Sequence, residues 1–153
     1  MFLIRCQTVF FCALVGALVL GLSGCAPAPQ DSTPYQVSNA SIRTPLPGRT
    51  VTAGYFDFKN NSDGIVTIVG VSSDIAKRIE MHTIKKVGEQ MRMRPLPELD
   101  VEPGAQVTFT SGGKHLMLFD AELAESPSIL KIELANGVVV EAPFQHTELI
   151  DAD

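Results

Sequence analysis

The stretch "GGKHLMLF", residues 112–119, has the pattern of a turn that leads into a buried strand. Two glycines suit the turn, and the leucines and phenylalanine that follow suit the interior of a sheet. Successive side chains of a strand point to opposite faces, so His115 and Met117 share one face while Leu116 and Leu118 lie on the other. One strand therefore presents an imidazole and a thioether together, either as packing residues or as half of a metal site.

The surrounding sequence repeats this pattern of short segments that are rich in β-branched and aromatic residues and separated by turn signals. Asn136-Gly137, between two apolar runs, is a strong hairpin signal. Residues 120–127 predict at most a brief helical turn, because no segment keeps a 3.6-residue apolar period over three turns. Many short strands in one chain predict an all-β fold, an antiparallel sandwich or barrel. Strands are expected at residues 35–43, 51–60, 64–73, 78–86, 89–95, 105–111, 115–119, 128–134 and 138–143.

The first 24 residues have the features of an export signal. Arg5 precedes an uninterrupted apolar run, Val9 to Leu22. That run is shorter than the roughly 20 residues that a membrane span needs. It ends in "LSGC", which resembles the bacterial lipobox, in which the cysteine is acylated and becomes the first residue of the mature chain. Residues 1–24 are therefore expected to be a lipoprotein signal peptide and Cys25 the lipidation site; an ordinary cleaved signal with a coincidental cysteine is the alternative.

The remaining chain divides into three parts. Residues 25–34 are Pro-rich and polar, typical of a flexible tether. Residues 35–148 provide one domain's worth of chain, and residues 149–153 form a C-terminal tail. We expect an extracytoplasmic lipoprotein anchored by lipid on the periplasmic side of the membrane. Alanine after Cys25 favours the outer membrane if the cell has two.

Cysteine and charge exclude several kinds of site. Cys6 and Cys12 lie in the signal, and Cys25 would carry lipid, so the mature chain has no disulfide and no thiolate for a metal or for nucleophilic chemistry. The formal net charge is −5 and the basic residues do not cluster, so no nucleic acid partner is expected. Neither a nucleophile–base pair nor a carboxylate dyad stands out, so the chain is expected not to be an enzyme.

Histidine and methionine are concentrated in one region. Two of the three histidines and four of the five methionines fall within residues 81–117. If "RIEMHTIKKVGEQMRMRP" is a hairpin with Val87-Gly88 as its loop, His82 lies opposite Met93, with Met91 on the same face and Met81 on the other. Together with the pair on the later strand, this hairpin predicts a set of two nitrogen and two sulfur donors: His82, Met93, His115 and Met117.

The donor types favour copper. Thioethers are soft ligands that prefer Cu(I), and imidazole also accepts copper. A blue-copper site is excluded because it needs a thiolate. From spacing alone, methionines that fill the core and histidines held by hydrogen bonds remain the alternatives. Met81 and His146 are expected to be dispensable for metal binding.

The spacing from His82 through Met93 and His115 to Met117 resembles the H-x10-M-x21-H-x-M signature of the periplasmic copper chaperone family called PCuAC. "MRMRP", "EPGAQVTF" and "GGKHLMLF" agree with it, and the resemblance covers about residues 36–144. It implies a cupredoxin-like, immunoglobulin-like β-sandwich that binds one Cu(I) near its surface. It also implies delivery to the copper centre of a haem-copper (cytochrome c) oxidase, directly or through a thiol-containing assembly partner.

The chain departs from the family in two respects. No tail rich in histidine and methionine follows the signature, which puts a second, Cu(II)-type site in doubt, and the lipobox would make this a tethered form. A monomer is expected. The alternative functions are a copper-storage or resistance lipoprotein that uses the same ligands, and a metal-free β-sandwich interaction domain.

Overall fold

Every regular element in the part of the chain that the structure describes is a β-strand. The computed structural model describes residues 33–124 and 126–148. The expected signal peptide, Cys25, most of the tether and the tail lie outside these residues and stay predictions. Within the two ranges there is no helix that could cross a membrane. The strands are β1 (Tyr35–Arg43), β2 (Thr52–Asn60), β3 (Val66–Ser72), β4 (Ala76–Val87), β5 (Gln90–Pro95), β6 (Leu99–Val101), β7 (Gln106–Phe109), β8 (His115–Ala121), β9 (Ser128–Leu134) and β10 (Val139–Thr147).

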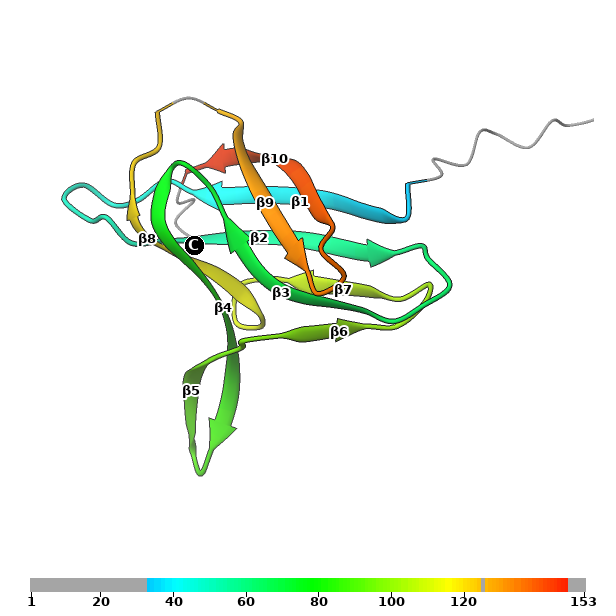
Figure 1. The fold of residues 1–153 in the computed structure, drawn as a ribbon. Coiled ribbons are helices and arrows are strands. Elements are labelled where there is room, and N and C mark those ends of the chain that lie inside the picture. Colours follow the sequence, from blue (N-terminus) through cyan, green and yellow to red (C-terminus); the bar gives the residue numbers. More distant parts are fainter. Residues whose placement is uncertain (1–32, 125, 149–153) are drawn as a thin grey trace, which may run out of the picture. The chain divides into compact units, whose positions relative to one another are not determined.

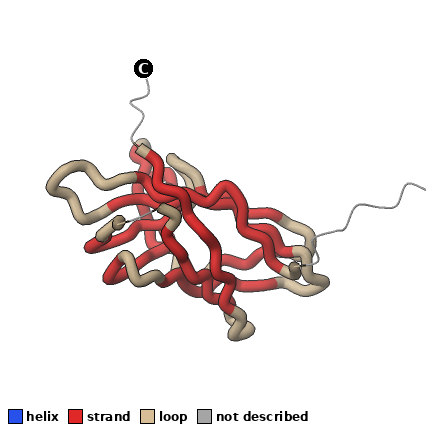
Figure 2. The backbone as a smooth tube through the Cα atoms, turned by 90° about the horizontal axis from the view of Figure 1, so that it is seen from above, coloured by secondary structure: helices blue, strands red, loops and turns tan. Residues whose placement is uncertain are grey.

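The strands form one continuous pairing that folds into two layers. Its order is β5-β4-β8-β2-β1-β10-β9-β3-β6, with β7 paired to β2. Neighbours are antiparallel apart from β1 and β10, which run parallel. Figure 1 shows β9 crossing over β1 and β2, and Figure 2 shows that strands make up most of the described chain. The predicted all-β sandwich is confirmed, with one parallel pair in an otherwise antiparallel arrangement.

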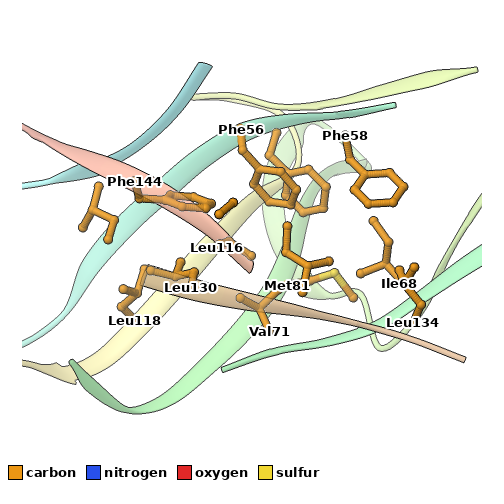
Figure 3. Close-up of a cluster of buried hydrophobic side chains, with 14 of the residues drawn as sticks. Phe56, Phe58, Ile68, Val71, Met81, Leu116, Leu118, Leu130, Leu134 and Phe144 are labelled. Atoms are coloured by element: carbon orange, nitrogen blue, oxygen red, sulfur yellow. The ribbon is translucent and has the colours of Figure 1, made fainter. Parts of the chain in front are cut away.

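The two layers enclose an apolar core. Leu116 and Leu118, the inward residues of the stretch at 112–119, are fully buried as predicted. They pack in the same cluster as Phe56 of β2 and Leu130 of β9 (Figure 3). Met81 of β4 is also in this cluster and only 5% exposed. Since alternate residues of a strand face opposite ways, this packing turns the neighbours of these residues toward the outside of the sandwich.

The loop of the β4–β5 hairpin differs from the predicted one. Val87 pairs with Gln90, so the two-residue loop is Gly88-Glu89 rather than Val87-Gly88. Gly88 has a φ of 62°, a left-handed conformation that glycine adopts without strain. Both favoured types of two-residue hairpin loop need a positive φ at their first central residue, which Gly88 adopts here and which the β-branched Val87 of the predicted loop would not adopt without strain.

The new register moves Met93 along the hairpin but leaves it on the same face. Met93 lies opposite Ile84, while His82 lies opposite Pro95, so the predicted pairing of His82 with Met93 is wrong. The shift is two residues, and side chains alternate with a period of two. Met93 and Met91 therefore still share the face of His82. The hairpin projects from the rest of the sandwich (Figure 1), and all of β5 is exposed.

The complete core lies in the second part of the chain. Residues Asp31–Asp153 form one compact unit, and each of the ten strands has its partner inside it. We therefore expect a chain that begins at Asp31 to fold by itself.

A buried amide joins the end of β2 to β6. The side chain of Asn60 is fully buried. Its Nδ2 donates to the carbonyl oxygens of Gly64 (2.7 Å) and Val101 (2.9 Å). Its Oδ1 accepts from the backbone N–H (3.0 Å) and the hydroxyl (2.6 Å) of Ser62. All four hydrogen-bonding positions of the amide are thus used.

Replacing this amide should be costly. Asn60→Ala leaves buried partners unpaired and should lower the free energy of unfolding by about 2–3 kcal/mol, measured by urea denaturation. Asn61→Ala is the control, because Asn61 is exposed and its amide makes one long bond, 3.4 Å to the carbonyl of Thr33. Equal losses in the two variants would contradict the role assigned to Asn60.

Candidate metal centre

The pairing of β4 with β8 brings the two histidines of the signature together. His82 and His115 are directly opposed residues of this antiparallel pair, and their ring centroids are 6.1 Å apart. With metal–nitrogen bonds of about 2 Å, two imidazoles on one ion have centroids roughly 5–6 Å apart. The observed separation of the two rings is therefore close to that of two imidazoles that share an ion. Met117 follows on β8, opposite Glu80, and its side chain lies on the same face.

His82 presents one nitrogen that has no partner. Its Nε2 lies 2.9 Å from Oε2 of Glu80, so Nε2–H donates to the carboxylate and Nδ1 carries the lone pair. Nδ1 is buried and has no hydrogen-bond partner among the described residues. A buried acceptor without a partner destabilises the fold. This atom is therefore suited to bind a metal.

His115 presents its other nitrogen. Its Nδ1 lies 3.1 Å from the carbonyl oxygen of Gly113, so Nδ1–H donates to the backbone and Nε2 carries the lone pair. In both rings one nitrogen is thus held by a hydrogen bond and the other is left for a ligand. Histidines that bind metals are commonly fixed in this way, because the outer bond sets the tautomer and the ring orientation.

Glu80 is the charged group nearest to the histidine pair. The hydrogen bond from His82 holds the pKa of the Glu80 carboxyl below its ordinary value; partial burial opposes this effect, and the charge of Arg78 adds to it. Arg78 forms an ion pair with Glu80, and its guanidinium carbon lies 4.1 Å from the centre of the Phe119 ring. Glu80 therefore stays ionised and remains a strong acceptor for the Nε2–H of His82.

The two methionines of the signature lie at the rim of an open groove. Together with His115, Met93 and Met117 line a groove of about 290 Å³, whose other wall is formed by residues 43–53. Met117 is half-buried, and Met93 is 44% exposed. His82 lies beside this groove and is 9% exposed. The structure thus brings three of the predicted ligands together on β4 and β8 and leaves Met93 on the adjacent strand, on the same face.

The remaining histidine and methionines are placed elsewhere. Nε2 of His146 lies 2.7 Å from the hydroxyl of Ser128, on β10, which is three strands from β8 in the sheet order. Met81 is in the core, and Met91 is 63% exposed near the hairpin tip. No group of three or more His, Cys, Asp or Glu side chains in residues 33–124 and 126–148 is arranged to hold a metal. A metal site on this face therefore depends on the thioethers.

Two features of the site were missed in the sequence. Glu80 is two residues before His82 and so shares its face in a strand, a signal that was present but not used. Arg43 and Arg49, which line the groove, come from β1 and the loop after it. They reach the site only through the pairing of β2 with β8, and no local pattern in the sequence predicts this pairing.

Comparison with known proteins identifies the family. Residues 35–143 match the family described as "Putative lipoprotein LpqE-like". The chain belongs to this LpqE-like family. It is 32% identical over 114 residues to the protein named "Putative lipoprotein Lxx21020" from Leifsonia xyli subsp. xyli (strain CTCB07), a match that covers 68% of this chain and 67% of the relative. These descriptions agree with a lipid anchor, whose predicted site at Cys25 is outside the described residues.

Solved structures show which fold the LpqE-like chain adopts. It matches the copper-bound PCuAC domain from PmoF2 with a TM-score of 0.63 and 18% identity, over 76% of this chain and 94% of that one. It also matches the solution structure of CuI-DR1885 from Deinococcus radiodurans with a TM-score of 0.56 and 19% identity, over 72% and 76% of the two chains. The PCuAC-type sandwich implied by the sequence resemblance is therefore confirmed.

Glu80 should control how His82 binds a metal. Glu80→Ala should lower Cu(I) affinity about tenfold, because outer hydrogen-bond partners of a ligating histidine typically have effects of this size. In the metal-free variant, His82 should also lose its preference for the Nε2–H tautomer, because the acceptor of that N–H is gone. ¹⁵N NMR of the imidazole measures this change. Glu89→Ala, a loop position on the same hairpin with a side chain that is 98% exposed, is the control for charge. An unchanged tautomer in Glu80→Ala would refute this role.

Proposed function

We propose that this protein is an extracytoplasmic Cu(I) carrier that binds one ion through His82, Met93, His115 and Met117. The observation that carries the proposal is the opposed histidine pair, with the buried, partnerless Nδ1 of His82 beside the thioether face. A metal-free role leaves that atom unexplained. The copper-bound state named for the PmoF2 domain, which has the same fold, supports the choice of metal.

The donor set suits Cu(I) more than other ions. Two neutral imidazoles and two neutral thioethers leave the loaded site with the single positive charge of the ion. Zinc and iron gain less from thioethers, which are soft. Thioethers bind without losing a proton, so only the imidazoles link binding to pH, and affinity falls as acid protonates them.

The differing exposure of the ligands suits transfer. The histidines are nearly buried on two central strands, whereas Met93 is exposed on the edge strand β5 and Met117 faces the groove. A thiolate of a recipient replaces the exposed thioethers first, while the imidazoles still hold the ion. The proposed recipient is a copper centre of a haem-copper oxidase or a thiol-containing assembly partner.

This role involves no catalysis. The comparisons agree with that, because the solved structures that share the fold are copper-bound or metal-free forms of PCuAC domains and of DR1885. Copper is the cargo of the proposed carrier rather than a reagent.

Cu(I) binding should depend on the sulfur of Met117. The reduced protein should bind one Cu(I), measured by competition with a chromophoric chelator, and should bind Zn(II) much more weakly. Met117→Leu should lower Cu(I) affinity at least tenfold while costing less than about 1.5 kcal/mol of stability. Met91→Leu is the matched control and should change affinity less than twofold. If Met117→Leu folds and binds Cu(I) like the wild type, the ligand set is wrong.

Transfer separates a carrier from a copper store. The loaded protein is mixed with a metal-free oxidase subunit that contains the copper centre, and copper in each protein is measured after separation. A carrier loses its ion to the subunit within the mixing experiment. Retention of copper by a fully loaded protein would favour storage or resistance instead.

We further propose that lipid on Cys25 holds the carrier at the extracytoplasmic membrane surface. One short acyl chain gives marginal binding, so the stable anchoring of a bacterial lipoprotein takes two or more. The wild type should fractionate with membranes, and Cys25→Ala should lose both the lipid and the processed form, as seen by mass spectrometry. A wild-type chain that is cleaved elsewhere and carries no lipid would contradict the anchor.

A further inference from the structure

The basic side chains of this acidic protein gather on one hairpin. Strands β4 and β5 with their loop carry six of the twelve lysines and arginines and two of the seventeen acidic residues, a net +4, although the whole chain has −5. The prediction that basic residues do not cluster is therefore wrong for this hairpin, the same one that carries His82 and Met93. The six are Lys77, Arg78, Lys85, Lys86, Arg92 and Arg94.

Most of this charge is not balanced within the described residues. Arg78 is paired with Glu80, and Lys86 is 4.0 Å from Glu89. The other four have no carboxylate within 4.0 Å there. Lys85 and Arg92 lie directly opposite each other in the antiparallel pair, on the face of the hairpin that points away from Met93. Like charges in this arrangement destabilise a sheet, and carboxylates of a partner would relieve the repulsion.

The groove beside the histidines has the same sign of charge and an apolar wall. Arg43 and Arg49 are the charged residues among those that line it, and no acidic residue does. The wall also includes Leu46 and Val51, which are 56% and 43% exposed. With Met93 they make a shared apolar lining of the groove, and contiguous exposed apolar patches of this kind are typical of surfaces that another molecule covers. Met93 and Met117 lie along the same groove, so whatever fills it reaches the copper ligands.

We propose that this end of the domain, namely the groove and the β4–β5 hairpin, docks an acidic protein segment with apolar side chains, carried by the copper recipient. The proposal rests on the proposed function for its purpose and adds the chemistry of the partner. Leucine-sized side chains cover Leu46 and Val51 in the groove. Carboxylates face Arg49 there and Lys86, which lies on the same face of the hairpin as Met93. A protein segment fits better than lipid headgroups, because the groove has walls and leads to buried ligands rather than presenting a flat basic face.

Such a surface mainly raises the rate at which the two proteins associate. Complementary charge raises association rates by tenfold or more, and the effect declines as salt screens it over about 10 Å at 0.1 M. The apolar wall then holds the segment in register with the ligands. The partner is thereby selected by its charge as well as by its thiols.

The test uses the soluble domain Asp31–Asp153, whose core is complete. Two fluorescein-labelled synthetic peptides of leucine, serine and glutamate, or of leucine, serine and lysine, are titrated with the metal-free domain and followed by anisotropy. The acidic peptide should bind at least tenfold more tightly at low salt, with the preference reduced at 0.5 M salt. Equal affinity for both peptides would overturn the proposal.

Charge-matched variants locate the surface. Arg49→Gln/Lys86→Gln removes one charge from the groove and one from the hairpin face that carries Met93; both side chains are exposed, so stability should not fall, and affinity for the acidic peptide should drop about tenfold. The control Lys59→Gln/Lys131→Gln removes the same charge on β2 and β9 and should change affinity less than twofold. Leu46→Ser should lower the affinity for the leucine-containing acidic peptide several-fold and leave the affinity for a leucine-free acidic peptide unchanged. Equal effects of the two double variants would refute the location.

Two further measurements separate the remaining outcomes. Co-sedimentation with phosphatidylcholine vesicles with and without phosphatidylglycerol tests lipid: binding to anionic vesicles without binding to the acidic peptide would overturn the proposal in favour of headgroups. Cu(I) affinity should stay within twofold of wild type in the two double charge variants and in Leu46→Ser. A domain that binds the acidic peptide but no Cu(I) would refute the proposed function and leave the docking surface standing.

Discussion

The geometry of the candidate site depends on the antiparallel register of β4 with β8. In that register His82 and His115 oppose each other, and Met117 follows on the same face. A slip of one residue would turn every side chain of one strand to the opposite face. The register is held from the other side of the sheet, where Met81 and Leu116 also oppose each other and are buried in the core. Burial of apolar side chains between the layers thus fixes the orientation of the candidate metal-binding face on the other side of the sheet.

This arrangement gives the site one rigid half and one open half. The histidines stand on strands with neighbours on both sides, and hydrogen bonds to Glu80 and Gly113 fix their rings. Met93 stands on the edge strand β5, whose six residues are all exposed. This asymmetry suits the proposed carrier, because an ion enclosed by four fixed ligands leaves slowly and an ion held by four loose ones is bound weakly. The fold provides it through the position of each strand in the sheet rather than through the ligand types alone.

Local patterns in the sequence predicted most of the fold, whereas long-range pairings were beyond them. The bounds of β1 and β9 agree with those expected; β9 alternates regularly, whereas β1 alternates only up to the irregularity between Ser38 and Ser41. The three-residue strand β6 was missed, since so short a segment shows no alternation. The alternation of side chains correctly predicted that His82 and Met93 share a face. Their predicted pairing was wrong, because Gly88 takes the first position of the hairpin loop with a positive φ. The opposition of His82 and His115 needs the β4–β8 pairing, which joins segments more than thirty residues apart and leaves no local trace.

In the proposed carrier, charge and copper loading act together at the end of the molecule that holds the candidate site. Charge counted over the whole chain gave an acidic protein, whereas the folded chain places Arg43 and Arg49 in the groove beside the candidate ligands and a basic hairpin next to it. In the proposed site, bound Cu(I) adds one positive charge among neutral ligands. The loaded form is then attracted more strongly than the empty form to the acidic segment proposed as its partner. Unit charges a few ångströms apart interact by about 1 kcal/mol even at the dielectric constant of water. Once the ion has passed to the recipient, the carrier loses that attraction while the recipient gains a positive charge, so both changes favour separation after transfer.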